Sequence, residues 1–335
     1  MEILDLASSG DSCCILLSAA EREALEVLYS HVKQRPQDDL EEFIIRATLV
    51  FHSIPERLRR CLLEFKRFGN REGVLLIRGL PVDAELPPTP RDSGRSTAKS
   101  TYVSELALAT FGSPLGESIS YLQEKNGEFY RNICPTARNE REWSSESSLD
   151  LLPFHTEAAF HPFLPSYVML YCLRSDHDMR ARTMVASIRR IAPRLVESDI
   201  EILRQNIFET GIDYSFGSST GKRGGGLVTA ICYGANDDPY LRYDPGLMTP
   251  HGSEGQEVMT RLDAVIDDLA SYVCLRPGDL LIIDNRRTVH ARTEFVPRYD
   301  GLDRWLQRSY LVDGLAESAR DRDGRVINTS FDVST

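Results

Sequence analysis

Apolar residues along this chain fall into many short runs, and the turns between them contain proline or glycine. Runs of this length predict strands. We expect strands at residues 73–79, 119–123, 128–133, 167–173, 183–188, 206–209, 227–233 and 280–283. Lys125, Asn126 and Gly127 separate the second and third runs, and they predict a tight turn that joins two strands as a hairpin.

Helical patterns are concentrated toward the N-terminus. Ser18 is placed to cap a helix over residues 19–32, with Glu21 three positions later in the capping-box position. A longer helical stretch over residues 39–68 is interrupted near Pro55. Further helices are expected at residues 101–110, in the stretch up to 205, and at 254–272. Many strands with flanking helices predict an α+β fold, mainly β, built as a β-sandwich or open barrel.

Composition narrows the class of protein. The 335 residues are 41% apolar and 27% charged, and no apolar run approaches the length of a membrane span. A net charge of −11 argues against nucleic acid as a partner, since phosphate binding requires a basic face. Glu2 and Asp5 stand where an export signal carries basic residues, and seven scattered cysteines fit reduced thiols. We therefore expect a cytoplasmic protein that binds neither membrane nor nucleic acid.

Two distant stretches carry the candidate chemistry. His155 and Glu157 form a His-x-Glu pair, and His290 follows a turn at residues 277–279 and the strand at 280–283. Two imidazoles and one carboxylate can cap one face of Fe(II) and leave positions open for a co-substrate and O2. The same three ligands also suit zinc, and a His-x-Glu pair on its own is common.

Two polar stretches allow simpler interpretations. Residues 137–150, directly before the His-x-Glu pair, are polar and on composition alone would be a solvated linker. Residues 217–226 contain Gly221 and Lys222, but lack the earlier glycine and the following Ser or Thr of a phosphate-binding loop. We expect that stretch to be a flexible loop.

The two chemical stretches together resemble the clavaminate synthase-like branch of the Fe(II)/2-oxoglutarate-dependent dioxygenases, which includes hydroxylases of free arginine, lysine and asparagine. The resemblance extends from about residue 73 to about 312 and is densest at 154–174 and 275–311. It implies a single domain with a helical scaffold at 1–72 and a double-stranded β-helix (jelly roll) core at 73–335. As the alternative to a solvated linker, it implies that residues 137–150 are a lid that closes over substrate. One departure is Ala291, directly after His290, where relatives often carry glycine. It changes none of the expected ligand residues.

The resemblance also implies roles for individual residues. His155, Glu157 and His290 would bind iron, and 2-oxoglutarate would be converted to succinate and CO2 as a C–H bond is hydroxylated. Arg304 and Thr183 match the positions that hold the far carboxylate of 2-oxoglutarate. The matched substrate positions are Arg308 for the α-carboxylate, Glu124 (or Gln123) for the α-amine, and Ser145 for a further hydrogen bond. A relative that only binds a metabolite is the alternative outside enzymes.

The substrate side chain is predicted from the segment that contains Asp244. Arginine hydroxylases of this branch carry two acids in the matching segment, whereas this chain has Asp244 and then Gly246. One carboxylate suits a compact ammonium better than a planar guanidinium, and Asp213 could assist. This favours L-lysine, hydroxylated at C3 or C4, over L-arginine, citrulline or asparagine. The simpler alternative is that Asp244 only caps its turn.

Overall fold

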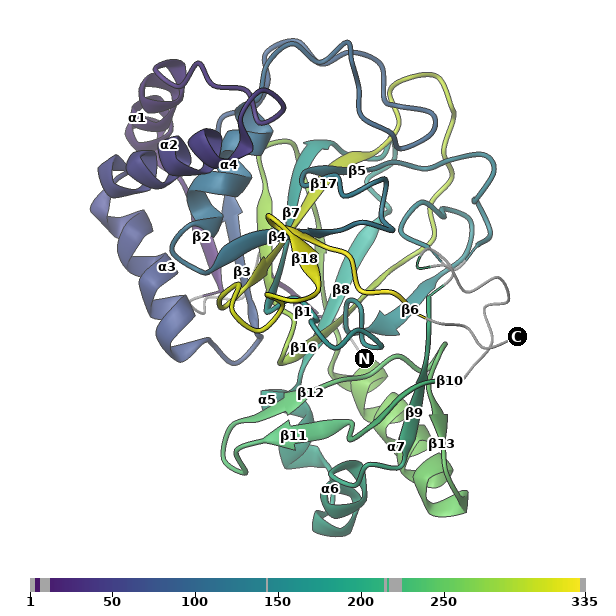
Figure 1. Cartoon of the computed structure of the whole chain (residues 1–335). Coiled ribbons are helices and arrows are strands. Elements are labelled where there is room, and N and C mark those ends of the chain that lie inside the picture. The colour runs from purple at the N-terminus through teal and green to yellow at the C-terminus, as the bar shows by residue number, and fades with distance from the viewer. Residues whose placement is uncertain (1–3, 7–12, 143, 214–215, 217–224, 332–335) are drawn as a thin grey trace.

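The computed structural model describes residues 4–6, 13–142, 144–213, 216 and 225–331, and it contains two facing β-sheets with helices on both outer surfaces (Figure 1). The larger sheet has the order β18 (Arg322–Asp323), β19 (Val326–Ile327), β4 (Glu117–Tyr121), β17 (Trp305–Val312), β7 (Tyr167–Arg174), β15 (Leu280–Asp284), β3 (Val74–Arg78) and β2 (Cys14–Leu16), with β5 (Arg131–Ile133) also paired to β17. The smaller sheet has the order β1 (Leu4–Asp5), β14 (Ser271–Cys274), β8 (Arg182–Ser187), β16 (Thr288–Arg292) and β6 (Leu152–His155). Two small sheets lie apart from these, one of β10 (Gly225–Thr229), β9 (Phe208–Gly211) and β13 (Thr249–Pro250), the other of β11 (Cys232–Gly234) and β12 (Pro239–Leu241).

Strand β15 shows how the sheets bury both of their faces. Leu280 and Ile282 pack in the cluster that contains the N-terminal helices, whereas Leu281 and Ile283 pack between the two sheets. Successive side chains of a strand point to opposite faces, so a continuous apolar run is what a doubly covered strand requires.

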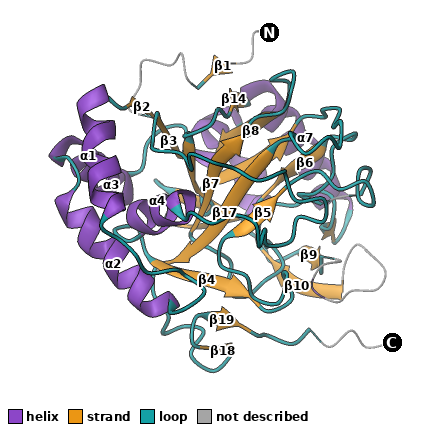
Figure 2. Cartoon of the chain, turned by 90° about the horizontal axis from the view of Figure 1, so that it is seen from above, coloured by secondary structure: helices purple, strands orange, loops and turns teal. Residues whose placement is uncertain are grey.

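Helices cover the outer surface of each sheet. The larger sheet is covered by α1 (Ala19–Ser30), α2 (Leu40–Ser53), α3 (Glu56–Phe68) and α4 (Val103–Gly112), and the smaller by α5 (Ile188–Ile191), α6 (Glu197–Leu203) and α7 (Ser253–Leu269), with a 3-10 turn at Ala192–Arg194. Seen from above, α1 to α4 lie on one side of the strands and α7 on the other (Figure 2). No helix in the described ranges is both long enough and apolar enough to cross a membrane.

Several predicted elements are confirmed. The Ser18–Glu21 capping box is present, with the Glu21 amide 3.2 Å from the Ser18 hydroxyl and the Ser18 amide 2.9 Å from the Glu21 carboxylate. The long N-terminal helical stretch is divided into α2 and α3 at Pro55. The loop predicted at 217–226 lies outside the described residues up to 224, and Gly225 and Gly226 belong to β10.

Other predictions were wrong where distant pairing decides the structure. β4 and β5 do not form a hairpin: both pair with β17, Ile119 opposite Tyr310 and Ile133 opposite Leu306. The Lys125–Gly127 turn exists, but β17 provides the ladder for both strands. The predicted helix at 254–272 ends at Leu269, because the residues that follow it form β14 against β8, and the run at 227–233 is divided between β10 and β11.

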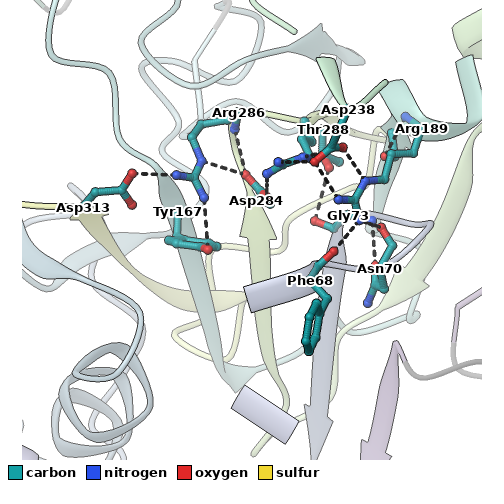
Figure 3. A network of polar contacts seen from close by, with 12 residues as sticks. Phe68, Asn70, Gly73, Tyr167, Arg189, Asp238, Asp284, Arg286, Thr288 and Asp313 are labelled. Carbon is teal, nitrogen blue, oxygen red and sulfur yellow. Dashed lines mark hydrogen bonds and ion pairs between the residues drawn. The ribbon is translucent and has the colours of Figure 1, made fainter. Parts of the chain in front are cut away.

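A chain of ion pairs holds the turn between β15 and β16 (Figure 3). The Asp284 carboxylate lies 2.8 Å from the Arg287 guanidinium, and Arg287 also lies 2.6 Å from Asp238. Arg189 binds the same Asp238 carboxylate at 2.8 Å and donates a hydrogen bond to the Phe68 carbonyl at the end of α3. These contacts fix the turn by which the chain passes from β15 in the larger sheet to β16 in the smaller one, which carries part of the site described next.

Candidate active site

Three predicted ligands meet between the sheets, at the edge of the smaller one. His155 is the last residue of β6, and it lies directly opposite His290 of β16, with their ring centroids 4.4 Å apart. Glu157 follows two residues after β6, and one side-chain ligand atom from each residue lies within 4.8 Å of the other two. Strand pairing thus brings together a His-x-Glu pair and a histidine that are far apart in sequence.

The protonation states of these groups suit a cation. Nδ1 of His155 lies 2.8 Å from the Pro153 carbonyl, which can only accept, so Nδ1 carries the proton of this contact and Nε2 is the ring nitrogen available to a metal. Burial and the His155 ring lower the pKa of His290 to about 4. Burial alone would raise the pKa of Glu157, but the Arg308 guanidinium and the His290 ring hold it well below its usual range. Two imidazoles and a charged carboxylate are a ligand set that fits Fe(II).

Glu157 is held by residues that the sequence did not single out. The Asn285 side chain accepts a hydrogen bond from the Glu157 amide (2.8 Å) and donates one to the Glu157 carbonyl (3.1 Å). The Tyr310 hydroxyl donates to Oε1 of Glu157 at 2.7 Å, and Oε2 faces Nε2 of His290 at 3.5 Å. One carboxylate oxygen is therefore fixed by hydrogen bonds while the other points toward the two histidines.

Arg308 and Glu124 form a buried ion pair next to this cluster. One Arg308 nitrogen lies 2.8 and 3.0 Å from the two Glu124 oxygens, and another lies 3.0 Å from Oε1 of Glu157. Burial would lower the pKa of Arg308, but these two carboxylates raise it above its ordinary value. Arg131 binds Glu124 at 2.5 Å and reaches Glu146 at 3.5 Å. Glu124 follows strand β4 in a turn, but it is buried and is not a solvated turn residue.

Arg304 is also buried but makes no ion pair with any carboxylate in the described ranges. Its guanidinium carbon lies 5.8 Å from the centre of the Phe295 ring, and burial lowers its pKa. Thr183 is buried on β8, directly opposite Arg292 of β16, whose guanidinium lies over the same Phe295 ring at 5.3 Å. These contacts link Arg304 and Thr183 through Arg292 and Phe295.

The other two candidates on the amino-acid side have different surroundings. Gln123 donates a hydrogen bond to the Thr329 carbonyl at 2.8 Å, so its side-chain amide is engaged by the C-terminal segment. Ser145 is half-buried in the loop before Glu146, and its hydroxyl has no hydrogen bond to any described residue. No hydrogen bond in the described ranges connects the side chain of Gln123 or Ser145 to the two histidines of the triad.

Asp244 caps its turn, as the simpler alternative proposed. Its Oδ1 accepts hydrogen bonds from the amides of Gly246 (3.0 Å) and Leu247 (3.2 Å). Burial raises its pKa, and the Asp213 carboxylate adds to this effect, whereas His155 opposes it. Asp244 therefore interacts electrostatically with His155 of the triad and with Asp213.

A second group of possible ligands contains His177, Asp300 and Asp303. Nε2 of His177 lies 3.1 Å from Asp300, whereas its Nδ1 lies 3.8 Å from Asp303. Each ring nitrogen therefore faces a different carboxylate, which is the arrangement of a bridging imidazole between two acids. We interpret this group as a structural contact of the loop that leads to Arg304.

Comparisons with known proteins agree with this geometry. Residues 56–310 match the family of the taurine catabolism dioxygenases TauD and TfdA. Clavaminate synthase 2 of Streptomyces clavuligerus is 39% identical over 291 residues, covering 87% of this chain and 89% of that protein. L-lysine 3-hydroxylase of Catenulispora acidiphila is 35% identical over 328 residues, covering 96% and 90%. The structure of an asparagine oxygenase with Fe(II), 2S,3S-3-hydroxyasparagine and succinate superposes with a TM-score of 0.87 at 35% identity, covering 95% of this chain and 100% of that one.

Proposed function

Because the chain belongs to the TauD and TfdA family of dioxygenases, we propose that it hydroxylates a free basic L-amino acid at C3 or C4, with L-lysine as the favoured substrate. It is a 2-oxoglutarate-dependent dioxygenase that uses Fe(II) and O2, as its relatives and structural neighbours do. The two facing sheets would form the jelly roll of this enzyme class. L-arginine, citrulline and asparagine are the alternative substrates, and metabolite binding without catalysis is the alternative function.

The triad of His155, Glu157 and His290 is the observation that carries the proposal. Its ligand atoms lie within 4.8 Å of one another, so all three residues would be able to hold a single cation. Iron bound there supplies the activation of O2. The protein fixes the ligands: the Pro153 carbonyl orients the His155 ring, and Asn285 and Tyr310 hold Glu157.

Arg304 and Thr183 are assigned to the far carboxylate of 2-oxoglutarate. A buried guanidinium that no described carboxylate neutralises is a suitable partner for a carboxylate, because the charge-assisted pair forms away from water. The Thr183 hydroxyl would add a hydrogen bond to the same carboxylate from β8 of the smaller sheet. This pair of residues would orient the co-substrate so that its other end reaches the metal.

Arg308 and Glu124 are assigned to the α-carboxylate and α-ammonium of the amino acid. Their charges are opposite, and they bind each other at 2.8 Å. A zwitterion carries both complementary charges, so it can insert between them and replace one ion pair with two. Arg131 would continue to neutralise Glu124 when substrate is bound. A compound without an α-ammonium would leave Glu124 with less compensation, which favours free amino acids.

Asp244 and Asp213 are assigned to the distal end of the substrate. Two nearby acids beside the metal cluster favour a cationic side chain, and the sequence offers no second acid at Gly246 to match a guanidinium. The similarity to L-lysine 3-hydroxylase over 96% of the chain supports lysine, whereas the similarity to asparagine oxygenase keeps asparagine as an alternative.

The test is a panel of free amino acids, scored by succinate formation and by the mass of the product. We expect lysine plus one oxygen, and Asp244→Asn should reduce that product more than it reduces succinate formed without substrate. Asp237→Asn, which removes the same charge from an exposed position, is the control and should leave the product unchanged.

Each other outcome has a defined meaning. Turnover of arginine without lysine would refute the argument from a single acid and leave the oxygenase intact. Iron binding without succinate or product from any amino acid would support the metabolite-binding alternative.

A further inference from the structure

Arg292 of β16 is a buried cation to which the proposed function gives no role. It follows His290 by two residues on the same strand, so both side chains point to one face. Its partner across the β16–β8 ladder is Thr183, one of the two residues assigned to the co-substrate. Residues directly opposite each other in an antiparallel pair share a face, so Arg292 lies beside the predicted carboxylate site.

The guanidinium of Arg292 holds the loop that precedes β6. It donates hydrogen bonds to the Ser147 hydroxyl (2.6 Å) and to the carbonyls of Asp150 (3.2 Å) and Ser148 (3.4 Å). The Phe295 amide binds the same Ser148 carbonyl at 2.8 Å. The Arg292 side chain therefore contributes three of the hydrogen bonds that attach residues 147–150, part of the predicted lid, to the smaller sheet.

Neutral oxygens are the main partners of this charge. Within the described ranges no carboxylate forms an ion pair with Arg292, and the same holds for Arg304. Both guanidiniums lie over the Phe295 ring, at 5.3 and 5.8 Å from its centre. Two buried like charges around one ring repel each other, and an anion placed at Arg304 would reduce that repulsion.

We infer that Arg292 is a positioning residue that couples the binding of the 2-oxoglutarate far carboxylate at Arg304 to the docking of residues 147–150. The inference rests on the proposed function, because it takes Arg304 as the carboxylate site. A carboxylate there stabilises Arg292 in the position from which it holds the loop. Coupling of this kind is reciprocal, so the docked loop also raises the affinity for the co-substrate.

The coupling also reaches the amino-acid side of the site. Glu146, next to the held loop residues, binds Lys125 at 3.0 Å and Arg131 at 3.5 Å, and Arg131 binds Glu124. Docking of the loop by the co-substrate therefore fixes part of the proposed site for the α-ammonium before the amino acid arrives.

The test is hydrogen exchange of the full-length Fe(II) protein under anaerobic conditions, with and without 2-oxoglutarate. In the wild type, 2-oxoglutarate should slow exchange of the backbone amides of residues 144–150 by at least about fivefold. Arg292→Gln should abolish this protection and weaken 2-oxoglutarate binding, measured by calorimetry, by a similar factor. Arg141→Gln is the matched control: Arg141 binds Asp150 of the same loop at 3.2 Å but is exposed, and this variant should keep both properties.

Two milder variants protect the test against misfolding of Arg292→Gln. Ser147→Ala removes one partner of the guanidinium, and Arg292→Lys keeps the charge but loses the fork; each should reduce the protection in part. Two results would overturn the coupling and leave the proposed function intact. One is a wild-type protein that binds 2-oxoglutarate normally without protection of residues 144–150; the other is full protection in Arg292→Gln, Arg292→Lys and Ser147→Ala. Absence of 2-oxoglutarate binding by the wild-type iron protein would overturn both the coupling and the proposed function.

Discussion

Arg304 lies directly before β17 and Arg308 lies within it, and their exposed fractions are 6% and 5%. Although both are buried, the charges around the two guanidinium groups differ. Arg308 contacts the carboxylates of Glu124 and Glu157, whereas Arg304 contacts the Phe295 ring and no described carboxylate. Burying an ion without a partner costs several kcal/mol, and a pair recovers much of that cost. The comparison teaches that one arginine is neutralised by the protein's own carboxylates, whereas the other has no such partner among the described residues, which is why we propose an external anion for it.

The largest effect is expected from removing a ligand of the proposed iron site, on which the proposed roles of both arginines depend. His155→Ala or His290→Ala should abolish iron binding and turnover, because two remaining ligands hold Fe(II) poorly. Metal content after anaerobic reconstitution and product mass are the measurements. His177→Ala, a histidine outside the triad, should retain iron. Product at the wild-type level in either triad variant would refute the assigned ligands.

Loss of each arginine should affect a different small molecule. Arg304→Ala should weaken 2-oxoglutarate binding by about 2–5 kcal/mol, because a buried carboxylate loses its charged partner. Arg308→Ala should chiefly raise KM for the amino acid and allow succinate to form without hydroxylation. Steady-state kinetics with each compound varied in turn separates the two. The reverse pattern would mean that the two roles are exchanged.

In the protein without ligands, substitutions of the two arginines should change the free energy of unfolding in different ways. Arg308→Met should lower the free energy of unfolding by about 3–5 kcal/mol, because Glu124 and Glu157 lose their shared cation. Arg304→Met removes a charge that has no described partner, so it should be neutral or stabilise by about 1–4 kcal/mol. Denaturant titration of the protein without metal and 2-oxoglutarate measures both values. Equal destabilisation would show that Arg304 has an internal partner.

The smallest expected effect concerns the second cation on Glu124. Arg131→Lys keeps the charge but loses the paired geometry, and it should weaken amino-acid binding by about 0.5–1.5 kcal/mol. KM for 2-oxoglutarate should stay unchanged in the same assay. An equal change in both constants would place Arg131 outside the amino-acid side of the site.

The sequence predicted the elements whose signals are local. The break at Pro55, the Ser18 cap and the buried β15 follow from neighbouring residues alone, and the structure contains all three. His155, Glu157 and His290 were grouped because the combination of their types has a chemical meaning. The structure brings them together through the β6–β16 pairing.

What the sequence did not predict depends on which distant strands pair. Asn285 holds Glu157 from the turn after β15 and Tyr310 holds it from β17, and no local pattern marks either residue. Arg292 was missed although it is two residues from His290, because its partners at residues 147–150 become visible only once β6 is placed beside β16. An even offset from a ligand along a strand is the one signal that pointed to it.

The position of β6 has a consequence for the stability of the folded protein. β6 is the edge strand of the smaller sheet, and its ladder with β16 is irregular between His290 and Arg292. More than a third of the chain lies between His155 and His290, so a metal ion that binds both closes a long loop, as a cross-link would. Loss of iron would remove this cross-link and leave the β6 edge to be held by its pairing with β16 and by the contacts of residues 147–150 with Arg292, so the bound metal would stabilise this edge of the sheet.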